Sequence, residues 1–152
     1  MESNAVPRDM ARFRQADRPA EPGMKPAPGI RVNAREPAAS GVILVVDDDS
    51  AVRELMTEFL VSAGFTVVSA MGGYEALRLL QETPGISLLL SDIRMPDLSG
   101  IELARQAKAG NPDLHVVLTS GYFSPQPMPY RFIRKPFRLG DLEAVVRSEL
   151  NE

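Results

Sequence analysis

Short apolar runs alternate with amphipathic segments along residues 41–152. An apolar run of five or six residues, bounded by polar ones, is typical of a strand that is covered on both faces of a parallel sheet. Such runs predict strands over residues 42–46, 65–70, 86–91, 114–119 and, more briefly, 131–134. Because helical patterns separate these runs, the sequence predicts a doubly wound α/β fold with a sheet of five parallel strands.

The segments between the runs carry apolar residues at helical spacing. Ser50 is predicted to cap the first helix, and Gly64 is expected to end it. The apolar stripe of this helix consists of Val52, Leu55, Met56, Phe59, Leu60 and Ala63, at positions i, i+3, i+4, i+7, i+8 and i+11. Further helices are predicted over residues 73–82, about 100–109, and 139–150.

Residues 1–40 differ from the rest of the chain in composition. They contain six prolines and no sustained apolar period, with seven Lys/Arg against five Asp/Glu. Such a stretch buries too little apolar surface to offset the entropy lost on ordering. We therefore predict a disordered tail or linker over residues 1–40 and a single domain over 41–152. A basic docking patch formed by the arginines of the tail is the alternative.

Composition excludes several classes of site and partner. The chain has no cysteine, so disulfides, thiolate catalysis and cysteine-ligated metal centres are excluded. No apolar run is long enough to span a bilayer, and the N-terminus lacks the apolar core of a signal peptide, so we expect a cytoplasmic protein without a membrane partner. Residues 41–152 carry ten Lys/Arg against fifteen Asp/Glu. This acidic balance is a poor match for nucleic acid.

Acidic residues follow two of the predicted strands. Asp47 and Asp48 come directly after the first strand, and Asp92 follows the third. Ligands of open parallel sheets bind beyond the carboxyl ends of the strands, so we expect these three carboxylates in one small pocket. Carboxylates at such short distances from one another stay ionised only if a cation is bound near them. Oxygen ligands favour a hard divalent ion, and Mg²⁺ is the usual one where phosphate is involved.

Two further polar residues are expected at the same edge of the sheet. Thr119 ends the fourth predicted strand and Lys135 follows the fifth. A carboxylate attacks phosphorus when metal and cations neutralise the charge that gathers there. In this chemistry Asp92 can be the nucleophile, the Thr119 hydroxyl can donate to a phosphoryl oxygen, and the Lys135 amine can pair with Asp92 or with the phosphoryl group. Taken singly, each residue could equally serve as a cap, a turn or a solvated side chain, and their joint placement favours the site.

Four motifs in a compatible order resemble those of a known family: Val-Asp-Asp-Asp at 46–49, Ser-Asp-Ile-Arg-Met-Pro-Asp-Leu-Ser-Gly at 91–100, Leu-Thr-Ser-Gly-Tyr at 118–122 and Arg-Lys-Pro-Phe at 134–137. With them, residues 41–152 resemble the receiver domain of two-component response regulators. The resemblance implies a flavodoxin-like sheet with strand order 2-1-3-4-5. It also implies that the domain is a phosphorylatable switch, and not an enzyme beyond its own phosphotransfer and slow dephosphorylation.

The resemblance assigns a role to each site residue. Asp92 would accept a phosphoryl group from a histidine kinase or a histidine phosphotransfer protein. Mg²⁺ would be bound by Asp47, Asp48, Asp92 and the backbone carbonyl of Arg94. Thr119 and Lys135 would contact the phosphoryl group. The switch residues would be Thr119 and Phe132, the aromatic three positions before the lysine.

The sequence departs from the family between Thr119 and Lys135, where the fourth helix normally lies. Pro125, Pro127 and Pro129 remove amide donors and force extended backbone, so we predict that this helix is missing or very short. Its loss disfavours the usual dimer, and we expect a monomer or weak dimer. The segment is most like that of receivers of hybrid histidine kinases or of stand-alone regulators. No DNA-binding output domain is expected, so output would pass to an unknown downstream protein.

Two alternative functions remain open from the sequence. A phosphatase of the haloacid dehalogenase type would use Asp47 as nucleophile and Asp49 as acid. A pseudo-receiver would bind a partner without phosphorylation. Two side-chain predictions complete the picture: Tyr122 is expected in the core, and Arg94 is expected near the site, either on phosphate or in solvent.

Overall fold

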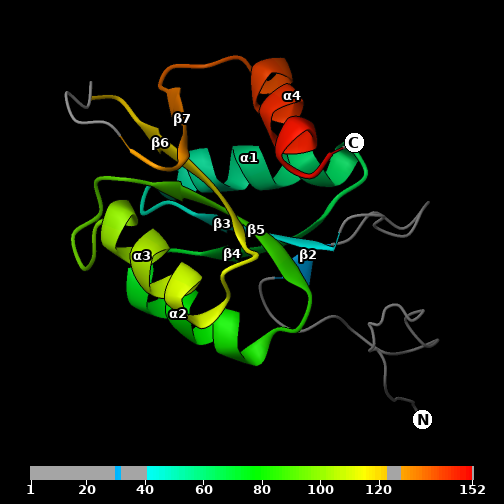
Figure 1. The fold of residues 1–152 in the computed structure, drawn as a ribbon. Coiled ribbons are helices and arrows are strands. Elements are labelled where there is room, and N and C mark those ends of the chain that lie inside the picture. Colours follow the sequence, from blue (N-terminus) through cyan, green and yellow to red (C-terminus); the bar gives the residue numbers. More distant parts are fainter. Residues whose placement is uncertain (1–29, 32–40, 123–127, 152) are drawn as a thin grey trace, which may run out of the picture.

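The computed structural model describes residues 30–31, 41–122 and 128–151. In these residues one mixed sheet is flanked by helices on both faces (Figure 1). The strands are β2 (Ile30–Arg31), β3 (Val42–Val46), β4 (Thr66–Ala70), β5 (Ile86–Asp92), β6 (His115–Ser120) and β7 (Arg131–Arg134). The helices are α1 (Ser50–Ser62), α2 (Gly73–Glu82), α3 (Gly100–Gly110) and α4 (Leu139–Glu149). Each of these helices is too short or too polar to cross a bilayer.

The strand order is β2-β4-β3-β5-β6-β7. Strands β3 to β7 are parallel, which confirms the five-stranded sheet and its order 2-1-3-4-5. The sixth strand, β2, pairs antiparallel with β4 and lies within the segment that we expected to be a tail. The outer side of β4 would otherwise be unpaired, and β2 covers it at Val67 and Val68. The rest of that segment, residues 1–29 and 32–40, lies outside the described residues.

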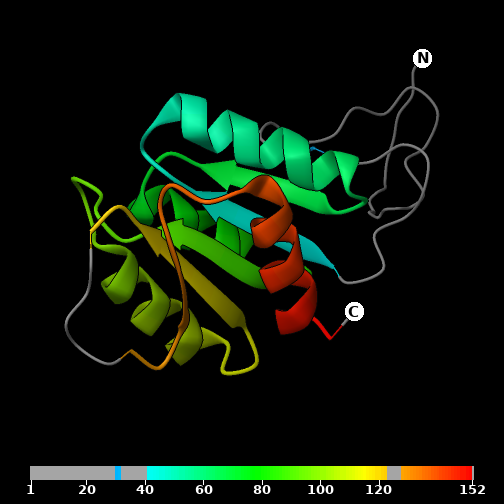
Figure 2. The same cartoon turned by 90° about the horizontal axis from the view of Figure 1, so that it is seen from above.

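In the described part of the chain, two helices cover each face of the sheet. Figures 1 and 2 show α1 and α4 on one face and α2 and α3 on the other. Side chains of β3 alternate between the two resulting cores: Ile43 and Val45 join the α1/α4 side, while Leu44 and Val46 join the α2/α3 side. All four are fully buried. The unbroken apolar run of this strand is thus explained by burial on both faces.

Helix α1 differs from its prediction at two places. Its N-cap is Asp49, whose carboxylate accepts hydrogen bonds from the amides of Ala51 and Val52, so the prediction of Ser50 as cap was wrong. Leu55 belongs to the predicted apolar stripe but is 54% exposed. The polar Thr57 is buried instead. The buried face of α1 is therefore rotated slightly away from the stripe that spacing alone predicts.

The connection between β6 and β7 contains no helix in its described residues, 121–122 and 128–130. This agrees with the expected loss of the fourth helix, although Pro125 and Pro127 lie outside the described residues. Met128, Tyr130 and Phe132 pack against the core on the α2/α3 side. These side chains provide apolar cover for Val116 and Leu118 of β6, on the α2/α3 face of the sheet.

Candidate functional site

The parallel register brings the predicted polar residues to one edge of the sheet. Val46 of β3 pairs with Ser91 of β5, and Asp92 pairs with Thr119 of β6. The next strand continues this edge, since Ser120 pairs with Arg134 directly before Lys135. A hollow of about 310 Å³ opens there, lined by Asp47, Asp48, Asp49, Asp92, Arg94, Ser120, Gly121, Tyr122 and Lys135.

Three carboxylates meet in this hollow. Asp47 is fully buried, Asp92 is 8% exposed and Asp48 is exposed. One oxygen of each lies within 4.8 Å of the others, which is close enough for all three to contact a single ion. An all-oxygen donor set with one solvent-facing member fits Mg²⁺, which usually keeps several water ligands. The predicted acid cluster is therefore present, and its chemistry fits the predicted ion.

Lys135 partly neutralises the acids. Its Nζ donates a hydrogen bond to Asp47 Oδ2 at 2.9 Å and lies 3.6 Å from Asp92 Oδ1. The second oxygen of Asp47 accepts from the Asp49 amide at 2.9 Å. Burial alone would lower the pKa of Lys135, but the hydrogen bond and charge of Asp47, together with the charge of Asp92, raise it. The amine thus stays charged and is held between two acids.

The electrostatics of Asp92 differ from those of a paired surface acid. Burial raises its pKa above the ordinary value, the charge of Lys135 opposes this, and the charges of Asp47 and Asp48 add to the rise. One ammonium group therefore does not fully compensate three carboxylates. A divalent cation at the cluster would stabilise the ionised form of Asp92.

Thr119 lies next to the hollow but does not line it. Its side chain is fully buried in β6, and its hydroxyl has no hydrogen-bond partner among the described residues. Buried hydroxyl groups in native proteins are normally paired, so an unpaired one at this edge of the sheet is unusual. The neighbouring Ser120, to which the receiver resemblance gave no role, lines the hollow, and its Oγ accepts a hydrogen bond from the Tyr122 amide at 3.1 Å.

Tyr122 and Arg94 form the outer wall of the hollow. The prediction that Tyr122 is a core aromatic was wrong, because it is 62% exposed. The Arg94 guanidinium lies over its ring, 4.2 Å from the centroid, in a cation–π contact. Arg94 is near the site, as expected, and its side chain is directed to the aromatic ring. Sequence reasoning also missed Arg53, whose guanidinium donates to the Asp47 backbone oxygen at 2.7 Å.

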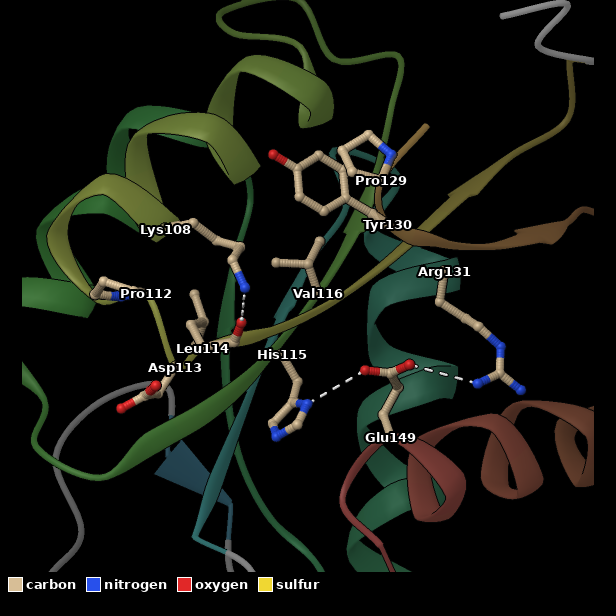
Figure 3. A pocket seen from close by; sticks show the side chains of 10 residues that line it. All are labelled: Lys108, Pro112, Asp113, Leu114, His115, Val116, Pro129, Tyr130, Arg131 and Glu149. Atoms are coloured by element: carbon tan, nitrogen blue, oxygen red, sulfur yellow. Dashed lines mark hydrogen bonds and ion pairs between the residues drawn. The ribbon is translucent and has the colours of Figure 1, made fainter. Parts of the chain in front are cut away.

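A second hollow, of about 270 Å³, lies at the opposite edge of the sheet, beside the start of β6 (Figure 3). Glu149 of α4 joins His115 and Arg131 there, at 3.3 and 3.4 Å. Lys108 donates to the Leu114 backbone oxygen at 3.0 Å. These groups are engaged with one another, and His115 is the first residue of β6. The acid-lined hollow is therefore the candidate site.

Comparison with known proteins shows similarity to one protein family. The model of the response regulator receiver domain family matches residues 43–147. The chain is similar to the response regulator receiver protein CpdR of Brucella abortus (strain 2308), with 39% identity over 107 residues, which are 66% of this chain and 88% of CpdR. It is also similar to the sensor kinase CckA of the same organism, with 32% identity over 127 residues, which are 78% of this chain but only 13% of the kinase.

Solved structures show the same likeness. The receiver domain of the hybrid histidine kinase CckA is 33% identical, with a TM-score of 0.66 over 72% of this chain and 99% of that domain. The response regulator protein TrrA from Thermotoga maritima, in complex with Mg²⁺–BeF, is 29% identical, with a TM-score of 0.66 over 72% of this chain and 98% of TrrA.

Proposed function

Because the chain belongs to the response regulator receiver domain family of two-component systems, we propose that Asp92 accepts a phosphoryl group from a phosphohistidine in a Mg²⁺-dependent step. One observation carries the proposal: three carboxylates and the ammonium group of Lys135 converge in the same hollow. Asp92 is the best nucleophile of the three. Both oxygens of Asp47 are already engaged, while Asp48 is exposed at the rim.

The transfer forms one bond and breaks one. An Asp92 carboxylate oxygen attacks phosphorus as the phosphorus–nitrogen bond of the phosphohistidine breaks, and the leaving imidazole nitrogen keeps the electron pair and takes up a proton. The product is an acyl phosphate on Asp92. Charge gathers on the transferred oxygens, so catalysis depends on positioned cationic and hydrogen-bonding groups.

The residues that would hold Mg²⁺ are Asp47, Asp48 and Asp92, with the backbone carbonyl of Arg94. When bound, the ion supplies positive charge to the phosphoryl oxygens and to the attacking carboxylate. The choice of Mg²⁺ is supported by the similar protein TrrA, whose structure is a complex with Mg²⁺–BeF. Arg53 contributes by holding the Asp47 backbone oxygen, which fixes the turn that presents both acids.

Lys135, Thr119 and Phe132 would respond to the new phosphoryl group. Lys135 is placed to pair with it, because its ammonium group lies 3.6 Å from Asp92. The unpaired hydroxyl of Thr119 would gain an acceptor by turning toward it. Phe132 is opposite Leu118, next to Thr119 in the register, and is half-buried, so its packing would change with that movement.

The phosphodonor would be a histidine kinase or a histidine phosphotransfer protein in the cytoplasm. The likeness to the receiver of a hybrid histidine kinase and to the receiver protein CpdR supports this class of partner. Output would pass to a downstream protein and not to nucleic acid, which the acidic balance of residues 41–152 disfavours. The domain would act as a monomer or weak dimer.

Phosphotransfer tests the proposal directly. Wild type, Asp92→Asn and the surface control Asp113→Asn are incubated with Mg²⁺ and a labelled phosphohistidine donor or acetyl phosphate. We expect alkali-labile label on wild type and on Asp113→Asn, and none on Asp92→Asn or after chelation of the metal. Label that persists on Asp92→Asn would refute the proposal. Phosphate-ester turnover that survives Asp92→Ala but is lost in Asp47→Ala would instead indicate a phosphatase.

A further inference from the structure

The segment between β5 and α3 is tied to a helix that comes earlier in the chain. Asp97 lies in this segment, five residues after Asp92. Its two carboxylate oxygens accept hydrogen bonds from the amides of Gly73 and Tyr74, both at 3.1 Å. Oδ1 also accepts from the Leu98 amide at 2.8 Å. An exposed acid is thus held by three backbone donors, two of which belong to the first turn of α2.

Asp97 replaces the cap that α2 lacks. The N-cap residue of α2 is Gly72, which has no side chain to accept from the free amides of the first turn. A carboxylate is the favoured partner at that end of a helix. Burial alone would raise the pKa of Asp97, but the hydrogen bonds from the amides of Tyr74, Gly73 and Leu98 together lower it, which agrees with a carboxylate bound in its ionised form.

The fit between the two segments requires glycine at two positions. A Cβ at Gly72 would lie 2.8 Å from Asp97 Oδ2, and a Cβ at Gly73 would lie 2.6 Å from Leu98 Cβ. Any larger residue would push the segment away from α2. The contact is therefore a close one that the sequence of α2 accommodates.

The other end of the segment is fixed to the site itself. Gly100 packs against the backbone of β5, where an added Cβ would lie 2.2 Å from the Asp92 carbonyl oxygen. Its amide donates to the Ile93 carbonyl at 2.8 Å, and the Ile93 amide donates to the Thr119 carbonyl at 2.8 Å. Between this anchor and Asp97 lie Arg94 and the carbonyl that would face the metal. The segment is thus held at two points, one on the site and one on α2.

We propose that Asp97 is a positioning residue for the acid site: by capping α2 across the chain, it fixes the segment that carries the Arg94 carbonyl relative to Asp92. Asp97 is not a member of the acid cluster, so it would act through the backbone and not as a ligand. Groups that orient the direct ligands of a metal typically change its affinity by about 10- to 100-fold when they are removed. This inference rests on the proposed function, since it concerns the same metal and phosphoryl site.

The test compares Asp97→Ala with two other variants. Asp97→Asn keeps an oxygen acceptor and loses the charge. Ser99→Ala is the matched control, because Ser99 caps α3 by accepting from the Glu102 amide at 3.1 Å, in the same segment but without a bond to α2. Calorimetry gives the Mg²⁺ dissociation constant, acetyl phosphate gives the phosphorylation rate, and urea unfolding gives stability.

We expect Asp97→Ala to weaken Mg²⁺ binding and slow phosphorylation by about tenfold, with Asp97→Asn recovering part of the loss. Ser99→Ala should lose comparable stability yet bind Mg²⁺ within about twofold of wild type, because it leaves the tie to α2 intact. Equal Mg²⁺ affinity in wild type and Asp97→Ala would overturn the proposal and leave Asp97 as a helix cap only.

Failure of the proposed function would be recognised separately. If wild type itself neither binds Mg²⁺ nor accepts phosphate, the proposed function is refuted. Amide hydrogen exchange then tests separately whether Asp97 fixes the segment between β5 and α3. Faster exchange of the Ile93 and Gly100 amides in Asp97→Ala than in Ser99→Ala would support the tie. Equal exchange in the two variants would overturn it.

Discussion

The hydroxyls of Thr57 and Thr119 permit a paired test of stability and function. Both are buried without a hydrogen-bond partner among the described residues. Valine has nearly the same shape as threonine and no hydroxyl, so substitution removes the desolvation penalty of an unpaired group, about 1–3 kcal/mol. Thr57 lies in α1, where the helix propensities of the two residues are similar. We therefore expect Thr57→Val and Thr119→Val each to raise the free energy of unfolding by about 1–2 kcal/mol.

The functional effect should separate the two variants. Thr119 adjoins the site and is proposed to bond the phosphoryl group, whereas Thr57 has no such role. Urea unfolding followed by circular dichroism gives the free energy of unfolding of each variant. In thermal unfolding, each kcal/mol of added stability should raise the melting temperature by roughly 4 °C. Beryllium fluoride, a phosphoryl analogue, is added together with Mg²⁺, and the response is measured as NMR chemical-shift changes of the β6 amides. Thr57→Val should show the same chemical-shift changes as wild type, and Thr119→Val should lose them.

Two results would refute this reasoning. A loss of more than 1 kcal/mol in Thr119→Val, beside a gain in Thr57→Val, would show that the Thr119 hydroxyl is paired in solution, for instance to a buried water molecule. A full beryllium fluoride response in Thr119→Val would show that the hydroxyl takes no part in the switch.

Three further predictions concern the charged groups. Lys135→Ala leaves buried Asp47 without its partner and should destabilise the fold by up to about 3 kcal/mol. In urea unfolding, this loss of stability should be smaller in saturating Mg²⁺. An equal loss of stability with and without Mg²⁺ would exclude a cation at the cluster. The pKa of Asp97 is lowered in the folded protein, so its stabilising effect is complete above pH 3.8, the ordinary pKa of the group, and is lost as the pH falls through the pKa of the folded state. The free energies of unfolding of wild type and Asp97→Asn should therefore converge in acid. A difference that stays constant with pH would contradict this. Glu149→Gln weakens the partly exposed contacts of Glu149 with His115 and Arg131 and should change the free energy of unfolding by less than about 1 kcal/mol. A larger change would indicate a structural role for the second hollow.

The sequence predicts the sheet and its acid edge well because both depend on local patterns. Buried strands need continuous apolar runs, and parallel connections bring their carboxyl ends to one edge. Asp47, Asp48 and Asp92 could therefore be placed together from their positions after two runs. Prolines likewise predict the loss of a helix without any tertiary information, because their effect on the backbone is local.

The errors arise where the choice depends on neighbours in space. Ser50 and Asp49 are both good caps, and only the path of the chain after β3 decides that Asp49 faces the free amides. Tyr122 lies at the surface, where its ring contacts the Arg94 guanidinium, and no periodicity reveals this partner. The tie between Asp97 and α2 spans 24 positions and was not predicted at all. The paired glycines at 72 and 73 were the available signal, since they mark a close approach.

The pairing of β2 with β4 has a practical consequence for handling the protein. A sheet has two lateral borders, and an uncovered one invites strands from other molecules to add to it. β2 covers the border at β4 opposite Val67 and Val68, while the border at β7 is only four residues long and carries exposed arginines at both ends. A chain shortened to begin at Gly41 would keep every residue of the acid hollow but uncover β4. Self-association of such a fragment would then reflect the missing shield and not a physiological dimer.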